Sequence, residues 1–410
     1  MSWIESTEIL GDWEGYDHGT VGRIAGRGRQ DPEEAWIELV PDATSTRYCS
    51  GCGEAVESIH DTQERWVRDL PILGAQTWLL VHRCRMACPR CGPRTEALEW
   101  LPLHARVTRR LADCVAELCK VLPIKHVAKF YGLSWTAVKR IDKAYLKKKL
   151  EPVDLRGLEV LAMDEFAIQR GHRYATVVLD PRNKRVLWVG RGRTREAVRP
   201  FFELLGRERC LRIRAVAMDM NSAFELEVAD HCPNAEVVFD LFHVVAKFGR
   251  EVVDRVRIDE ANRVSKSKKD RKVIKSARWL MLRNRENLTT DGRVRLGELL
   301  KANKKLMTVY VLKDDLKHLW DFRYAGAAER FWKGWYSRAM RSRIEPLKRF
   351  AKRLKGYLPG IISHCRWPLH TSLLEGINNK IKVIKRMAYG FRDDEYFFLK
   401  IRSAFPGNRR

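Results

Sequence analysis

The sequence predicts a multidomain protein: a cysteine-rich module, a helical module, and an α/β domain that a long helical segment interrupts. Three observations predict this fold class. Two Cys-x-x-Cys-Gly motifs lie near the N-terminus, a helical stretch with a short turn follows them, and apolar strands alternate with helices from residue 158 onward. A length of 410 residues has room for roughly two to four domains.

The charge of the chain indicates a polyanionic partner. Lys and Arg number 78 and Asp and Glu number 52, which gives a formal net charge of +26. Nucleic acid is the leading candidate, although a merely basic protein or an enzyme with a solvated cationic face has the same balance. The N-terminus lacks the basic and apolar regions of a secretory signal, and no long apolar run occurs. We therefore expect a cytoplasmic protein with no membrane partner.

The clustered cysteines predict a structural zinc ribbon with one Zn²⁺ and no catalytic role. Each motif places two thiolates two residues apart before a glycine that allows a tight turn, and four thiolates suit one tetrahedral zinc ion. Without an export signal, a disulfide framework is not expected. Cys84 is a possible substitute ligand, and reduced, unligated cysteines are the alternative. The predicted ligands are Cys49, Cys52, Cys88 and Cys91.

Residues 111 to 150 have helical periodicity with one interruption, which is typical of a helix-turn-helix. Gly132 allows the chain to leave the first helix with positive φ, and Ser134 is a natural N-cap for the second. The exposed face of the second helix would then face a DNA major groove. A plain helical hairpin is the alternative. The side chains expected to contact DNA are Trp135, Thr136, Lys139 and Arg140.

Strands and helices alternate from residue 158. The expected strands and helices lie at 158–164, 173–180, 185–190, 195–206, 211–219, 223–231 and 235–240. Their order, β-β-β-α-β-α-β, is that of a ribonuclease H-like fold, in which the first and fourth strands are neighbours.

The first and fourth of these strands each end in a carboxylate, and as neighbours they would bring Asp164 and Asp219 to one edge of the sheet. Two buried carboxylates repel each other, and a divalent cation between them removes that penalty. We therefore predict a metal site at this edge. The alternative is that each Asp only forms a turn at the end of its strand.

The motifs around these residues resemble those of bacterial DDE transposases, and more narrowly those of the ISL3 insertion-sequence family. The resemblance covers nearly the whole chain, and the ordered set of motifs is more specific than any one of them. The similar segments are Ala162-Met-Asp164-Glu-Phe, Ala217-Met-Asp219-Met, Phe239-Asp240-Leu-Phe-His243-Val, Thr371-Ser-Leu-Leu-Glu375-Gly-Ile-Asn378-Asn379-Lys380-Ile-Lys382 and Arg386-Met-Ala-Tyr-Gly390-Phe391.

The resemblance implies that Asp164, Asp219 and Glu375 form a DDE triad that holds two Mg²⁺ or Mn²⁺ ions. Hard Mg²⁺ prefers oxygen ligands. One ion would activate a water or a DNA 3′-OH, and the other would stabilise the leaving oxygen. The implied reaction is cleavage at transposon ends and strand transfer into target DNA. The residues alone do not distinguish Glu375 from three other candidates, Glu329, Glu345 and Glu395.

The spacing between Asp219 and Glu375 exceeds what a minimal core needs, so we expect a basic, all-helical insertion between them. Within it, Trp320, Trp332 and Trp335 either stack on an unpaired base or pack in a helical core. The predicted boundaries are 1–100 for the zinc ribbon, 101–152 for the helix-turn-helix, 153–244 and 366–410 for the catalytic core, and 245–365 for the insertion.

By the same resemblance, the partner is double-stranded DNA, both transposon ends and target, bound by a homodimer or larger oligomer in a synaptic complex near the bacterial nucleoid. The dense positive charge makes this binding salt-dependent. His243 is either paired with Asp240 structurally or a contact to the DNA end. The remaining predicted DNA contacts are Lys380, Lys382 and Arg386.

Two other function classes stay open from the sequence. A non-catalytic DNA-binding regulator would explain the first 150 residues but not the placement of Asp164 and Asp219. Another ribonuclease H-like nuclease, such as a resolvase, would need no long basic insertion. Metal-dependent nicking of DNA that carries the element's ends would exclude the regulator.

Overall fold

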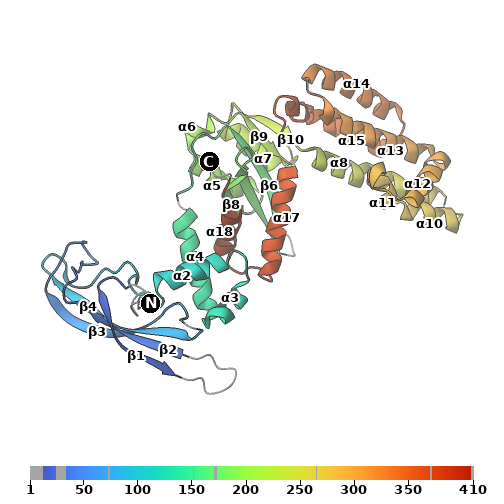
Figure 1. The fold of residues 1–410 in the computed structure, drawn as a ribbon. Coiled ribbons are helices and arrows are strands. Elements are labelled where there is room, and N and C mark those ends of the chain that lie inside the picture. Colours follow the sequence, from blue (N-terminus) through green and yellow to red (C-terminus); the bar gives the residue numbers. More distant parts are fainter. Residues whose placement is uncertain are drawn as a thin grey trace, which may run out of the picture. The chain divides into compact units, whose positions relative to one another are not determined.

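The computed structural model describes residues 13–24, 34–72, 74–150, 152–169, 173–264, 266–369 and 372–407. The chain divides into two compact units, and Figure 1 labels their helices and strands. The first unit comprises Met1–Glu151 with Arg386–Tyr389, and the second comprises Pro152–Lys385 with Gly390–Arg410. Among the described helices, none is both long and apolar enough to cross a membrane.

The first unit contains a five-stranded sheet. Buried and partly exposed residues alternate along its longest strand, as expected where one face of a strand lies on a core. That core contains Trp13, Tyr16, Ile37, Leu39, Val67, Leu79, Val81 and Leu101. The strands are β1 (Tyr16–Ile24), β2 (Glu34–Pro41), β3 (Ile59–Arg68), β4 (Gln76–Cys88) and β5 (Gly92–Thr95), in the order β1-β2-β4-β3 with β5 paired to β4.

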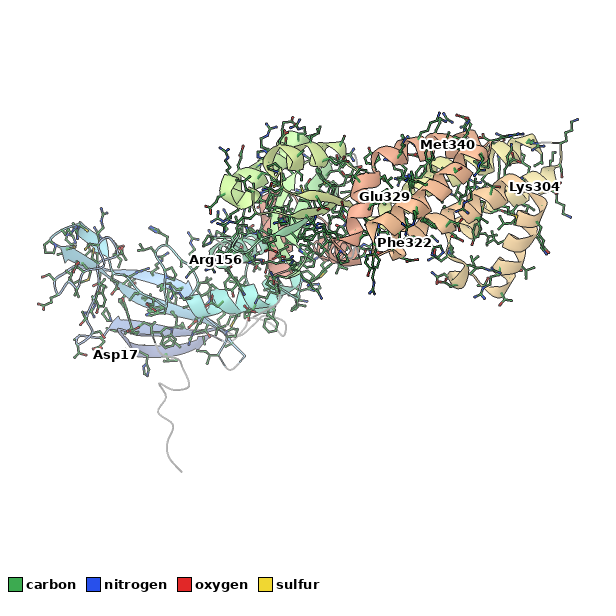
Figure 2. All side chains as sticks on the ribbon, turned by 90° about the horizontal axis from the view of Figure 1, so that it is seen from above. Asp17, Arg156, Lys304, Phe322, Glu329 and Met340 are labelled. Carbon is green, nitrogen blue, oxygen red and sulfur yellow. The ribbon has the colours of Figure 1, made fainter. Side chains whose placement is uncertain are left out.

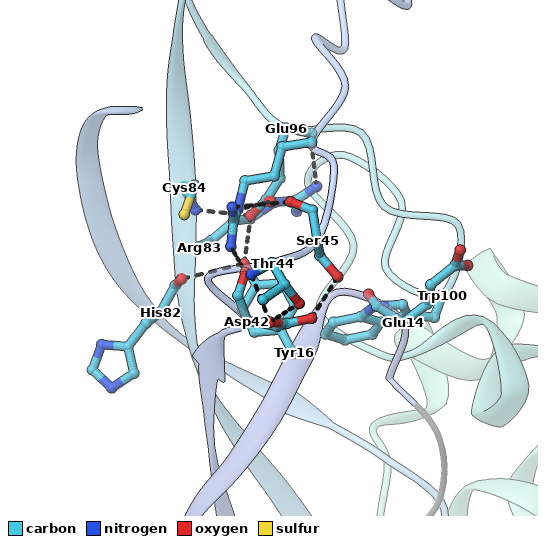
Figure 3. A network of polar contacts seen from close by, with 11 residues as sticks. Glu14, Tyr16, Asp42, Thr44, Ser45, His82, Arg83, Cys84, Glu96 and Trp100 are labelled. Atoms are coloured by element: carbon cyan, nitrogen blue, oxygen red, sulfur yellow. Dashed lines mark hydrogen bonds and ion pairs between the residues drawn. The ribbon is translucent and has the colours of Figure 1, made fainter. Parts of the chain in front are cut away.

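Glu96 joins the first strand to the cysteine-rich part of this sheet (Figure 3). Its buried carboxylate accepts hydrogen bonds from the Tyr16 hydroxyl and, at 2.8 Å, from the Cys84 backbone N–H. The Arg83 guanidinium donates to the Glu96 backbone carbonyl at 3.2 Å. Burial and the charge of Glu96 raise the pKa of Tyr16, so the phenol stays a hydrogen-bond donor at neutral pH.

Three helices follow the sheet, namely α2 (Arg109–Leu118), α3 (Ile124–Tyr131) and α4 (Trp135–Leu150). The predicted turn between the last two is confirmed. Gly132 has φ 61°, and a Cβ there would lie 2.3 Å from Gln76 Nε2. Ser134 Oγ accepts the Ala137 N–H at 3.1 Å, as an N-cap does. The buried side chains between the helices include Leu111, Val115, Val127, Tyr131 and Val138.

The second unit is built on a sheet with the strand order β10-β9-β6-β7-β8. Strand β7 pairs antiparallel with β6, and β8 pairs antiparallel with β7. On the other side, β9 pairs parallel with β6, and β10 pairs parallel with β9. The predicted adjacency of the first and fourth strands is therefore confirmed. The bounds are β6 (Val160–Gln169), β7 (Arg173–Asp180), β8 (Arg185–Arg191), β9 (Ala215–Met218) and β10 (Glu236–Phe239).

The first of these strands does not end at Asp164, which corrects the prediction from sequence. Pairing of β6 with β9 stops at Ala162 opposite Ala217, but pairing with β7 continues through Asp164 opposite Val177 to Gln169. The backbone beyond Asp164 therefore keeps an antiparallel partner after its parallel partner has ended. Asp164 therefore lies inside β6, two residues after the last residue that pairs with β9.

Helices lie on both faces of this sheet. Leu161 and Met163 share a hydrophobic core with side chains of α5 (Arg195–Leu205) and α7 (Ser222–His231). Phe166, on the opposite face, meets Phe397 of α18 (Asp394–Ala404) edge to face, with ring centroids 6.1 Å apart. Because side chains alternate along a strand, Asp164 lies on the same face as Phe166. The residues after α18 close on the sheet, where Phe405 O accepts the Val186 N–H at 3.2 Å.

In its described part, the chain between β10 and residue 365 consists of helices joined by short loops. It contains α8 (Leu241–Phe248), a π-helical turn (Gly249–Val253), α9 (Asp254–Arg263), α10 (Lys268–Ser276), α11 (Arg278–Leu282), α12 (Thr290–Ala302), α13 (Lys304–Lys317), α14 (Ala325–Arg341), α15 (Glu345–Gly356) and α16 (Leu358–Ile362). Figure 2 labels four side chains of this segment, Lys304, Phe322, Glu329 and Met340. Its apolar side chains continue the core of the sheet, since Phe239 of β10 packs on Tyr357 with ring centroids 5.4 Å apart.

The tryptophans of this segment pack in its core. Trp332 and Trp335 are buried and stack on each other with ring centroids 5.2 Å apart, and Trp335 Nε1 donates to Leu312 O at 2.8 Å. Trp320 is half-buried and stacks on His364. Base stacking is therefore the wrong interpretation for Trp332 and Trp335, whose ring faces are covered by neighbours.

One charged side chain in this core gives a testable pH dependence. Lys313 is 1% exposed, and its ammonium donates to Met281 O at 2.5 Å. Burial lowers its pKa to about 8 from the usual 10.5. Between these two values the unfolded chain binds a proton that the folded chain does not, so folding becomes more favourable as pH rises.

We expect Lys313→Met to stabilise the protein at pH 7 by on the order of 1–3 kcal/mol, because a costly buried charge is removed. The advantage should shrink as pH rises toward 10, and melting curves at pH 7, 8, 9 and 10 measure it. Lys317→Met, one turn further along α13, is the control, because Lys317 is more exposed and paired with Asp314 at 2.9 Å. An advantage of Lys313→Met that is constant across this pH range would contradict the prediction.

Candidate active site and metal centre

The four predicted zinc ligands come together in the first unit. One ligand atom from each of Cys49, Cys52, Cys88 and Cys91 lies within 4.8 Å of all the others. Cys52 Sγ and Cys88 Sγ are 3.7 Å apart. A tetrahedral zinc ion with Zn–S bonds of about 2.3 Å requires sulfur atoms about 3.8 Å apart, so the cluster fits zinc. Cys84 is buried in β4 and is not a member of this cluster.

Local backbone geometry builds the cluster. The glycines after the two motifs, Gly53 and Gly92, have φ of +77° and +69°, which are the conformations that the predicted turns need. The backbone N–H groups of Cys52 and Gly51 lower the pKa of Cys49 to about 7, and the Gly51 N–H lies 3.3 Å from Cys49 Sγ. The neighbouring cysteines Cys52 and Cys49 raise the pKa of Cys91 to about 12. Four thiolates this close are stable only with a cation among them.

A second group of polar side chains gathers at the edge of the sheet in the second unit. Asp164 is 5% exposed and lies inside β6, and Asp219 directly follows β9. Each carboxylate accepts the backbone N–H of the next residue. Glu165 N–H donates to Asp164 Oδ1 at 2.7 Å, and Met220 N–H donates to Asp219 Oδ1 at 2.6 Å. The Oδ2 atom of each Asp is left to face the other side chains of the site.

His243 occupies the space next to Asp219. The N-cap Asp240 starts α8 by accepting the Phe242 N–H at 2.7 Å, which places His243 in the first turn. His243 Nδ1 lies 3.1 Å from Asp219 Oδ2, and Nε2 lies 3.7 Å from Asp240 Oδ2. The sequence predicted a pairing of His243 with Asp240, three residues earlier, but not the closer one with Asp219, which is 24 residues away in the chain.

The charges of these groups are strongly coupled. Burial raises the pKa of Asp164 to about 6, against the opposing effects of His243, a backbone N–H and Asn378. Burial has the same effect on Asp219, but the hydrogen bond and charge of His243 outweigh it and lower the pKa of Asp219. Burial disfavours a charged His243, yet the hydrogen bond to Asp219 and the negative charge of the three aspartates raise its pKa. The site therefore attracts positive charge.

The helix α17 (Ser372–Met387) lies beside β6 in Figure 1 and contributes to the same site. Asn378 Nδ2 donates to Asp164 Oδ2 at 2.6 Å. Glu375 lies one turn earlier on the same helical face and is exposed. Within the described residues, the four cysteines are the one set of three or more His, Cys, Asp or Glu side chains with ligand atoms this close together. The structure brings Asp164, Asp219 and His243 close together, and Asn378 joins the helix that carries Glu375 to Asp164.

The sequence motifs contained Asn378 but did not reveal its role. The available signal was its spacing of three residues from Glu375, which places both on one face of a helix. An open groove also borders Asp219, and its lining includes Glu165, Arg193 and Arg195. Arg193 is paired with Glu165 at 3.0 Å, so the groove has both charges at its rim.

The predicted DNA contacts have different surroundings. Trp135 is 52% exposed at the start of α4, Thr136 and Arg140 are exposed, and Lys139 Nζ lies 5.8 Å from the centre of the Trp135 ring. On α17, Lys382 Nζ donates to Asn379 Oδ1 at 3.2 Å, and Arg386 is exposed in the last turn.

Lys380 makes an internal bond that the sequence did not predict. Its Nζ donates to Ala404 O at 2.9 Å and lies 5.0 Å from the centre of the Phe405 ring. This lysine therefore also contacts the end of α18.

Comparisons with known proteins agree with this architecture. The family model of the ISL3 transposases matches residues 161–401, that of the helix-turn-helix domain of the same transposase family matches residues 96–146, and that of the zinc-finger of IS204/IS1001/IS1096/IS1165 transposases matches residues 45–91. The chain is 51% identical to the transposase for insertion sequence element IS1001 of Bordetella parapertussis over 404 residues, which is 98% of each chain. It is 26% identical to the transposase for insertion sequence element IS1557 of Mycobacterium tuberculosis, over 97% of this chain and 92% of that one.

Proposed function

The chain belongs to the ISL3 family of insertion-sequence transposases, and we propose that it cuts and joins DNA with Asp164, Asp219 and Glu375 as its catalytic acids. As a transposase it is a DNA-cleaving and strand-transferring enzyme, so a non-catalytic regulator or an unrelated nuclease is not favoured. The observation that carries the residue assignment is the meeting of Asp164 and Asp219 from adjacent strands at one sheet edge, beside the helix that bears Glu375.

We infer a ribonuclease H-like core at residues 153–244 and 366–410, interrupted by a helical insertion at 245–365. The mixed strand order around β6 supports the core. Contacts of the C-terminal helices with β6 and β8 support the return of the chain to the sheet after the insertion. The zinc ribbon would comprise residues 1–100, and the helix-turn-helix residues 101–152.

We propose that the acidic site holds two Mg²⁺ or Mn²⁺ ions. The donors fit such ions, because all three acids offer oxygen and Asp164 is a buried carboxylate next to another carboxylate. When bound, these ions supply the activation of a nucleophile and the stabilisation of a leaving oxygen in phosphoryl transfer. The backbone N–H groups of Glu165 and Met220 hold the two aspartates in place, and His243 Nδ1 lies 3.1 Å from Asp219 Oδ2.

We propose that the basic chain binds both transposon ends and target DNA, as a dimer or larger oligomer in the bacterial cytoplasm close to the nucleoid. The helix-turn-helix would bind the ends with Trp135, Thr136, Lys139 and Arg140, and the exposure of the first turns of α4 supports this role. Near the acids, His243, Lys380, Lys382 and Arg386 would contact the DNA. In the structure, the ammonium of Lys380 also donates to Ala404 O.

The helix-turn-helix assignment predicts a loss of specificity in Arg140→Ala. We expect the difference in binding free energy between transposon ends and unrelated DNA to shrink by about 1–3 kcal/mol, since one direct base contact is lost. Fluorescence anisotropy with both DNAs at several salt concentrations measures this difference. Lys125→Ala, which removes one positive charge from an exposed position on α3, is the control and should leave this difference unchanged. If both variants lose the same amount of specificity, then α4 is not the helix that recognises the DNA sequence.

The proposal is tested by nicking of a plasmid that carries the element's ends. The purified protein should cut this plasmid only with Mg²⁺ or Mn²⁺ present, and Asp164→Ala should not cut it. Binding of the ends without any cutting, under every divalent metal condition, would refute the catalytic assignment.

A further inference from the structure

The side-chain amide of Asn378 makes a hydrogen bond with its nitrogen but not with its oxygen. Its Nδ2 donates to Asp164 Oδ2 at 2.6 Å, whereas its Oδ1 is buried and has no hydrogen-bond partner. Rotation of the amide by half a turn would place Oδ1 against the carboxylate, where two acceptors repel. The bond to Asp164 therefore sets the amide orientation and leaves the carbonyl oxygen as the free end.

A second bond keeps this face of α17 against β6. Lys385, two turns after Asn378, donates from Nζ to Ala167 O at 3.0 Å. Asn378 contacts Asp164, and Lys385, seven residues later on the same face of the helix, contacts Ala167 of the same strand. Two contacts from one helical face to one strand fix the rotation of the helix about its axis. Ile377 and Ile381 are buried, which supports the same orientation. The amide of Asn378 therefore points into the acidic site because of packing, and it cannot easily turn away.

A buried acceptor without a partner costs about 1–3 kcal/mol, and most buried polar atoms in proteins are satisfied. The missing partner must be a proton donor or a cation. The nearest side chain in the site, Asp164, is a carboxylate, and it already receives the amide N–H. The ring nitrogens of His243 face other groups, since Nδ1 lies 3.1 Å from Asp219 Oδ2 and Nε2 lies 3.7 Å from Asp240 Oδ2. A divalent cation is a suitable partner, because side-chain amide oxygens of Asn are common ligands of hard cations.

We propose that Asn378 is part of the metal-binding site: its N–H positions the Asp164 carboxylate, and its Oδ1 binds the divalent cation held by Asp164, directly or through one water bound to that cation. This inference rests on the proposed function, since it needs a cation at the acidic site. It also links α17 to the metal site through a residue one turn from Glu375. Loss of Asn378 thus affects both the ligand and the placement of the helix that carries the third acid.

The test is Mn²⁺ binding by the zinc-loaded, full-length protein without DNA, measured by isothermal titration calorimetry. Asn378→Ala should weaken Mn²⁺ binding by about 10- to 100-fold, the usual effect of losing such a supporting group. Asn379→Ala is the matched control. Asn379 is exposed and its Oδ1 accepts from Lys382, so this variant should bind Mn²⁺ as the natural protein does.

Asn378→Asp gives an outcome of the opposite sign and guards against a simple folding defect. A third carboxylate beside Asp164 repels it in EDTA and lowers the melting temperature, but it supplies an additional anionic ligand. This variant should therefore bind Mn²⁺ at least as tightly as the natural protein and gain more thermal stability from it. A residue that only packs the helix would lose Mn²⁺ affinity equally in both variants, and that result would overturn the inference.

Asp164→Ala separates this inference from the function on which it rests. If Asp164→Ala loses Mn²⁺ binding and Asn378→Ala does not, then the acidic metal site stands and the role of Asn378 is refuted. If the natural protein and Asp164→Ala bind Mn²⁺ equally, then the proposed function itself fails.

Discussion

Asp219→Asn will abolish DNA cleavage while leaving the binding of transposon ends nearly unchanged. The substitution keeps the size of the side chain but removes one of the two carboxylates that adjacent strands bring to the sheet edge. Without it, the site lacks the second charge that would hold the proposed divalent cations, and transition-state stabilisation of several kcal/mol would be lost. We expect the cleavage rate to fall at least about a thousandfold, which single-turnover cleavage of end-labelled DNA measures.

The control is the same substitution at another strand end. Asp180 closes β7 and accepts backbone N–H groups from Arg182 and Asn183, which is a turn-forming role that Asn also fulfils. Asp180→Asn should cut DNA at close to the natural rate. Cleavage by Asp219→Asn within tenfold of the natural rate would show that Asp219 is not a metal ligand.

Cys88→Ser will remove zinc from the protein and unfold the cysteine-rich part of the first unit. The four sulfur atoms lie within 4.8 Å of one another, and a structural zinc site of this kind contributes about 10–16 kcal/mol of binding free energy at neutral pH. Without the ion, the remaining thiolates repel each other and the turns at Gly53 and Gly92 lose the force that closes them. We expect the zinc content to fall from one ion per chain to nearly none.

The loss should extend from the zinc site to DNA recognition. Affinity for the transposon ends should fall at least tenfold, because the sheet of the first unit is bonded to the start of the helix-turn-helix. Asp69, directly after β3, accepts hydrogen bonds from Thr108 and Arg110. Cys84→Ala is the control, because Cys84 is buried in the same strand but is not a zinc ligand. Full zinc content and unchanged end binding in Cys88→Ser would contradict this role for the cluster.

Local patterns in the sequence predicted local structure well. The turn between α3 and α4 was predictable from Gly132 and Ser134, since positive φ and the N-cap are properties of single residues. The two cysteine motifs likewise carry their own turn geometry. The burial of Trp332 and Trp335 was not predictable in the same way, because a helical tryptophan packs or stays exposed according to which helices surround it.

The acidic site shows the same division between local and non-local information. Element order was sufficient to predict that Asp164 and Asp219 lie on adjacent strands, and the strand pairing confirms it. Element order could not predict that β6 continues to Gln169, because the antiparallel partner β7 decides where that strand ends. Glu375 as the third acid rests on the family and stays a prediction.

By itself the sequence determined the family of this protein, its order of modules, the four cysteines that come together in the first unit and the strands that carry two acids, because these follow from short motifs and from periodicity. Only the tertiary structure decided which groups meet those acids. His243 contacts Asp219 and Asn378 contacts Asp164 across long separations in the chain. Such contacts depend on how a helix is rotated against a sheet, and that rotation is set by the packing of the whole unit rather than by any segment of it.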